Sequence, residues 1–137
     1  MSTESIYPWQ QHDWERLQQL RDRLPHAMLF HGVQGIGKVA FAERFAASLL
    51  CEQPLADGHA CGGCDSCGWF GQYAHPDYRR VRPDALETEA TDDAESDDGS
   101  TKKSTKTPSK DIRIEQVRAL AAFMNVSTHR AGQRVVL

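Results

Sequence analysis

The stretch that decides the fold is Gly32-Val33-Gln34-Gly35-Ile36-Gly37-Lys38. It fits the pattern G-x-x-x-x-G-K and lies between an apolar run at 27–30 and an amphipathic helix at 38–50. Glycines let backbone N–H groups turn toward phosphate oxygens, and the helix start and Lys38 add positive charge. We interpret the stretch as a phosphate-binding loop (P-loop); a glycine-rich turn with a surface lysine is the alternative.

The residue after the loop lysine departs from the pattern. A working phosphate loop has Ser or Thr there, whose hydroxyl helps to hold Mg²⁺, whereas Val39 offers no oxygen. A phosphate cradle can survive this change, but metal placement for hydrolysis should suffer. We therefore expect ATP or ADP binding to be weak or absent, and we assign no catalytic residue. The expected nucleotide-binding residues are Gly32, Gly35, Ile36, Gly37, Lys38 and Val39.

Apolar residues alternate along the chain between helical spacing and short continuous runs. Helices are predicted over 11–23, 38–50 and 114–124, and strands over 27–30, 78–81 and 134–137. This alternation favours an α/β fold with a parallel sheet. Because the last apolar run reaches Leu137 as a strand begins, we expect residues 1–137 to be the N-terminal part of a larger domain.

All four cysteines fall within 17 residues, spaced as C-x9-C-x2-C-x2-C. They are Cys51, Cys61, Cys64 and Cys67. Four thiolates from one glycine-rich loop suit tetrahedral Zn²⁺, and a closed four-sulfur site is structural because it leaves no position for substrate. Disulfides and an iron–sulfur cluster are the alternatives. His59 and His75 are further candidate ligands, although four cysteines already complete the set.

Composition and charge exclude several classes of protein. The chain has 16 Lys and Arg against 19 Asp and Glu, for a net charge of −3, which argues against a compact basic nucleic-acid binder. No run of 18 apolar residues is present, and the first twenty residues lack the apolar core of a secretory signal. We therefore expect a cytoplasmic protein.

Residues 84–110 differ from the rest of the chain in composition. Residues 84–98 hold eight acids and no base, and the whole segment lacks aromatic residues, valine and isoleucine. Such a segment buries too little apolar surface to offset its ordering entropy. We predict a disordered insertion over 84–110, with a charged helix over 84–95 as the alternative.

These features resemble a known family in combination. A phosphate loop, four zinc-type cysteines one helix later (the module 51–67) and the tripeptide His75-Pro76-Asp77 resemble the AAA+ subunits of the bacterial clamp loader. Within that family, the sequence is similar to delta-prime subunits through Val39 and the opening Tyr7-Pro8-Trp9. The tau/gamma motor, in contrast, has threonine after the loop lysine. The resemblance leaves out the insertion 84–110.

The resemblance implies a function that the residues alone do not establish. It implies a structural stator in a hetero-pentamer with tau/gamma and delta subunits, acting on the sliding clamp and primer-template DNA through that complex. The subunit would belong to a DNA-directed DNA polymerase (nucleotidyltransferase) holoenzyme without a catalytic site of its own. A tau/gamma-type ATPase, an independent phosphate-loop ATPase or kinase, and a zinc-ribbon nucleic-acid module are the alternatives.

The composition of 84–110 predicts where proteases cut. Trypsin should cleave first after Lys102, Lys103 or Lys106, because unstructured backbone fits a protease active site most readily. Mass spectrometry of a limited-digestion time course measures this order. Early cleavage after Arg79 or Arg82, with those lysines protected, would show that the segment is folded or bound.

Overall fold

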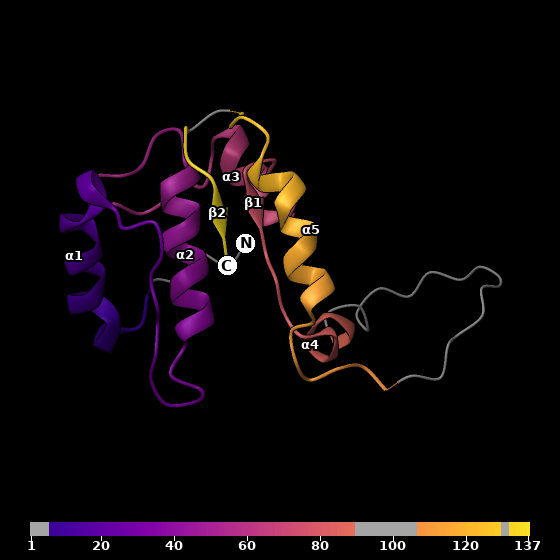
Figure 1. Ribbon diagram of the computed structural model, residues 1–137. Coiled ribbons are helices and arrows are strands. Elements are labelled where there is room, and N and C mark those ends of the chain that lie inside the picture. The colour runs from indigo at the N-terminus through magenta and orange to yellow at the C-terminus, as the bar shows by residue number, and fades with distance from the viewer. Residues whose placement is uncertain (1–5, 90–106, 130–131) are drawn as a thin grey trace, which may run out of the picture. The chain divides into compact units, whose positions relative to one another are not determined.

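The structure is a computed structural model, and it describes residues 6–89, 107–129 and 132–137 (Figure 1). The elements in chain order are the 3-10 turn η1 (Pro8–Gln10), α1 (Gln11–Gln19), the 3-10 turn η2 (Arg21–Arg23), α2 (Lys38–Leu50), α3 (Asp65–Gly71), β1 (Tyr78–Arg79), α4 (Asp84–Glu89), α5 (Ile114–Met124) and β2 (Val135–Val136). The contacts divide the chain into two units: Met1–Tyr78 with Thr128–Val135 and Leu137, and Arg79–Ser127 with Val136.

Helix α2 is the centre of the first unit and has the predicted bounds. It begins after Gly37, whose φ of 88° is left-handed and therefore suits glycine. It ends where Cys51 turns to extended backbone. Its apolar residues recur every three or four positions, so they form faces that can be buried on a helix. Buried in α2 are Phe41, Ala42, Phe45, Ala46, Ala47, Ser48 and Leu50.

One face of α2 packs against α1, and the two helices run side by side in Figure 1. Trp14 and Leu17 of α1 form a core cluster with Phe41 and Phe45 of α2. The predicted helix over 11–23 was too long, because α1 ends at Gln19 and a 3-10 turn follows. The proline at position 25 favours extended backbone at the residue before it, and the chain is extended there with ψ at 129°.

The other end of α2 packs against a second cluster. Ala46, Ala47 and Leu50 contact Phe70 of α3 and Tyr78 of β1. Strands β1 and β2 pair in a two-stranded sheet, and the N–H of Val135 donates to the carbonyl of Asp77 at 2.9 Å. This second cluster places the cysteine loop between α2 and α3.

The prediction of a strand at 27–30 was wrong for the described residues. The backbone of this segment is irregular, and Leu29 is 84% exposed. A strand forms only when a neighbouring segment makes backbone hydrogen bonds with it. No described segment pairs with residues 27–30. The mixed helix and strand content agrees with the α/β class, but the predicted parallel P-loop sheet is not seen in these residues. The predicted strands at 78–81 and 134–137 are shorter, as β1 and β2.

In the second unit, the start of the predicted disordered insertion is helical. Helix α4 covers its first six residues, which is the described part of the alternative, a charged helix over 84–95. Glu87 pairs with Arg82 at 3.0 Å and Asp84 pairs with Arg113 at 3.0 Å. The pairing with Arg82 lowers the pKa of the Glu87 carboxyl. The rest of the prediction, over 90–106, lies outside the described residues.

Helix α5 has the bounds of the predicted helix, and several of the apolar residues whose spacing predicted it are exposed. Val117 is 54% exposed and Met124 62%. In the same unit, the guanidinium of Arg79 lies 4.7 Å from the centre of the Phe123 ring. None of the helices in the described part of the chain combines the length and apolar character that crossing a membrane requires.

The packing of Trp14 predicts a large stability effect. Its indole is 1% exposed, so Trp14→Ala should lower the free energy of unfolding by about 3–5 kcal/mol through lost burial and a residual cavity. Trp9, at 60% exposed, is the matched control, and Trp9→Ala should cost about 1 kcal/mol or less. Urea unfolding followed by circular dichroism measures both. Equal losses in the two variants would contradict this description of the core.

Candidate functional site

The predicted phosphate-binding residues form one loop at the start of α2. Gly35 and Gly37 have φ values of 81° and 88°, so the chain turns in conformations that other residues rarely adopt. The Lys38 ammonium donates to the carbonyls of Gly32 at 2.9 Å and Val33 at 2.7 Å. Val39, the second residue of α2, is 59% exposed. The lysine therefore lies over its own loop, and the valine brings no polar atom to it.

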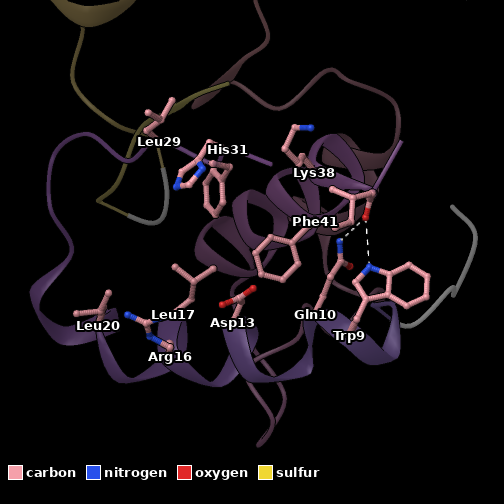
Figure 2. Close-up of a pocket in the computed structure, with 12 residues that line it drawn as sticks. Trp9, Gln10, Asp13, Arg16, Leu17, Leu20, Leu29, His31, Lys38 and Phe41 are labelled. Atoms are coloured by element: carbon pink, nitrogen blue, oxygen red, sulfur yellow. Dashed lines mark hydrogen bonds between the residues drawn. The ribbon is translucent and has the colours of Figure 1, made fainter. Parts of the chain in front are cut away.

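A turn near the N-terminus holds the carboxyl end of this loop (Figure 2). The Gln10 side-chain amide donates to the carbonyls of Ile36 and Gly37 at 3.2 Å each, and its oxygen accepts the N–H of Tyr7 at 3.2 Å. The Trp9 indole N–H also donates to the Ile36 carbonyl, at 3.4 Å. A Cβ at Gly37 would lie 2.7 Å from the Tyr7 ring. The loop is thus fixed by tertiary contacts that no sequence motif predicted.

A cavity of about 930 Å³ lies between α1, the loop and the start of α2. Figure 2 shows Asp13, Arg16 and Leu17 of α1 on one side of the cavity, with His31 and Lys38 on the opposite side. Its lining residues are Trp9, Gln10, Asp13, Arg16, Leu17, Leu20, Leu29, Phe30, His31, Ile36, Lys38 and Phe41. Two of the predicted nucleotide-binding residues, Ile36 and Lys38, therefore face a space large enough for a small ligand.

The four predicted metal ligands do come together. The sulfur atoms of Cys51, Cys61, Cys64 and Cys67 all lie within 4.8 Å of one another. The Cys51–Cys64 and Cys61–Cys67 sulfur pairs are each 3.9 Å apart. A tetrahedral ion with metal–sulfur bonds of about 2.3 Å separates its ligands by about 3.8 Å. The thiols are free rather than paired as disulfides, and the arrangement can hold one metal ion.

The protonation of the thiols depends on their surroundings. Burial raises the pKa of the Cys51 thiol. Burial and a hydrogen bond to Cys64 raise the pKa of the Cys67 thiol. Backbone hydrogen bonds lower the pKa of the Cys61 thiol to about 6; the bond from Gly63 has the largest effect, and the bond from Cys64 the next largest. The surroundings of Cys61 therefore favour its thiolate form, and a bound cation would favour the thiolate form of the others.

The two histidines considered as additional ligands have other roles. His59 stacks on Trp14, with ring centres 4.1 Å apart and planes 8° apart. His75 is fully buried and hydrogen-bonded to Ser66 and Asp77. Neither belongs to the group of sulfur atoms, so the cysteines alone form the described set of ligands.

The loop from Cys51 to Cys61 is docked on α1 and the turn that follows it. The Trp14 indole N–H donates to the Asp57 carbonyl at 2.9 Å, and the Arg21 guanidinium donates to the carbonyls of Gly58 at 3.2 Å and Ser48 at 2.5 Å. Gly58 has a φ of 84°, and a Cβ there would overlap the Gln18 side chain. These anchors were not predicted, because neither Trp14 nor Arg21 is near the cysteines in the sequence.

Comparison with known proteins assigns the family. The family described as DNA polymerase III, delta subunit matches residues 9–137, and the chain belongs to it. The chain is similar to DNA polymerase III subunit delta' of Pseudomonas aeruginosa, at 39% identity over 132 residues, which are 96% of this chain and 33% of that protein. It is 36% identical to subunit delta' of Escherichia coli over 81 residues, 57% of this chain and 24% of that protein.

A shorter similarity extends to a second subunit. The chain is 42% identical to DNA polymerase III subunit tau of Escherichia coli over 45 residues, 33% of this chain and 7% of that protein. The chain thus spans about a third or less of the length of these curated relatives. The resemblance to delta-prime subunits that the motifs indicated is confirmed.

The cysteine geometry predicts the metal content of the protein. Purified protein should carry about one zinc per chain, bound by the four cysteines. Cys64→Ser should loosen residues 51–73 and leave α2 protected, as measured by amide hydrogen exchange. Elemental analysis is the direct measurement. Iron in place of zinc, or two intramolecular disulfides without metal, would contradict the assignment.

Proposed function

We propose that this protein acts as a delta-prime subunit of the bacterial clamp loader, a structural AAA+ stator that helps to load the sliding clamp onto primed DNA. The observation that carries the proposal is the 39% identity to a subunit named delta' over 96% of this chain. The partners we propose are the tau/gamma and delta subunits in a hetero-pentamer, with clamp and primer-template DNA bound through that complex. We place this activity in the cytoplasm.

The stator role is supported by the glycine loop. Phosphoryl transfer needs Mg²⁺ to neutralise developing charge, and the residue after the loop lysine normally helps to hold it. Val39 cannot do so, and Lys38 must exchange its two carbonyl bonds for phosphate oxygens before a nucleotide binds. We therefore propose a degenerate P-loop (Gly32 to Val39) with weak or absent nucleotide binding and no catalytic site in this chain.

The metal centre we propose is structural zinc. Two of the sulfur–sulfur distances are 3.9 Å, close to the spacing in a closed tetrahedral site, and all four sulfur atoms lie within 4.8 Å of one another. Zinc bound there would stabilise the loop between α2 and α3 and take no part in a reaction.

A tau/gamma-type ATPase is the alternative function, because 45 residues of the chain are 42% identical to subunit tau. An independent P-loop ATPase is a second alternative. Both require a hydroxyl residue where this chain has Val39. The alternatives and the stator therefore differ in one measurable property, the turnover of ATP.

Nucleotide titration separates these functions. With the full-length protein, Mg²⁺ should change ATP affinity little, and Lys38→Ala should abolish whatever binding remains. Val39→Thr is the matched variant, because it restores the hydroxyl at an exposed position without changing side-chain size, and it should make any binding dependent on Mg²⁺. ATP turnover by the isolated protein at roughly 1 s⁻¹ or faster would instead indicate a motor subunit or an independent ATPase.

Assembly gives the second measurement. Mixed with delta and tau/gamma subunits, the full-length protein should co-elute in one complex that places a sliding clamp on primed DNA. Lys38→Ala should leave both properties unchanged, since a stator does not use the nucleotide. Failure to join the complex would contradict the proposed role.

A further inference from the structure

We propose that Glu52, Ser66 and His75 form a hydrogen-bonded clasp that positions the two halves of the four-cysteine centre and slows the release of its metal. This inference rests on the proposed metal centre. None of the three residues supplies a ligand, and we describe them as positioning residues.

The hydrogen bonds of the clasp form a chain with defined donors and acceptors. The N–H of Asp77 donates to Nδ1 of His75 at 3.0 Å, so that nitrogen carries no proton and the neutral ring has its proton on Nε2. Nε2 lies 3.3 Å from the Ser66 hydroxyl oxygen and donates to it. The hydroxyl in turn donates to the Glu52 carboxylate at 3.2 Å. His75 is 0% exposed and Ser66 1%.

The positions of these residues explain what the clasp would do. Glu52 directly follows Cys51 at the end of α2, and Ser66 lies in the first turn of α3, directly before Cys67. The clasp therefore joins the segment that brings the first cysteine to the helix that carries the last. Because Cys51 and Cys67 are separated by 15 residues of mostly irregular chain, this side-chain link limits how far the two can move apart.

The clasp is anchored at its histidine end. Both carboxylate oxygens of Asp77 accept the N–H of His129 at 3.0 Å, and the Asp77 carbonyl accepts the N–H of Val135 at 2.9 Å. Asp77 is 0% exposed. Hydrogen bonds among the buried members of such a network favour one arrangement of their side chains, so the strand pair holds His75, and His75 holds α3.

Zinc release measures the clasp without reference to replication activity. In the full-length protein, Ser66→Ala should speed zinc transfer to a colorimetric chelator about tenfold, the low end of the range for residues that support metal ligands. Ser66→Thr keeps the hydroxyl and should restore slow release. The matched control is Ser48→Ala, because Ser48, at 0% exposed, is buried like Ser66 but donates locally to the Phe45 carbonyl within α2.

A second pair of variants guards against a folding defect. Glu52 is exposed, so Glu52→Ala removes the acceptor with little risk to the core and should also speed release. Gln53→Ala is its exposed neighbour control and should not. Circular dichroism and thermal unfolding of each variant separate faster metal release from general loss of stability.

The outcomes distinguish the two proposals. Equal release from wild type, Ser66→Ala and Glu52→Ala would overturn the clasp and leave the metal centre standing. Release that accelerates equally in Ser66→Ala and Ser48→Ala would also overturn it, since loss of stability alone would then explain the change. Wild-type protein without bound metal would overturn the metal centre and the clasp together.

Discussion

The burial of one tryptophan connects the parts of the first unit. The Trp14 ring meets the rings of Phe41 and Phe45 in edge-to-face geometry at 6.0 and 6.2 Å, and it stacks on the ring of His59. Its N–H donates to the carbonyl of Asp57. A single side chain therefore packs α1 on α2 and holds the cysteine loop against α1. Burying so large an aromatic ring is among the strongest local contributions to folding, and its N–H is satisfied at the same time.

Helix α2 separates the two candidate sites by a fixed distance. The glycine loop leads into its first residue, Lys38, and Cys51 follows its last, so its 13 residues keep the loop and the cysteine centre about 20 Å apart. Each site is then held by contacts from outside the helix. Gln10 binds the carbonyls at the end of the glycine loop, and Ser66 and Glu52 connect the segments that carry the cysteines. The two candidate sites are therefore anchored by separate sets of contacts.

Predictions from the sequence succeeded where the signal was local. The bounds of α2 followed from its apolar periodicity and from Gly37, because both act within a few residues. The gathering of the four sulfur atoms followed from their spacing within one loop. The prediction for 27–30 failed because a strand depends on a partner, and Leu29 is exposed in the absence of one among the described residues. The apolar face of α5 is exposed for a related reason, since periodicity predicts a face but not what covers it.

The sequence by itself determined three things: the mixed content of helix and strand, the glycine-loop and four-cysteine motifs, and the family resemblance. Each depends only on the type and spacing of residues along the chain. Only the tertiary structure decided which distant side chains complete the sites. Gln10 reaches Gly37, Trp14 reaches Asp57 and His75 reaches Ser66. The first two of these contacts join residues 27 and 43 positions apart. Long-range hydrogen bonds of this kind form only when packing of the core has brought the elements together and removed water from between them, and no local pattern of residues encodes them.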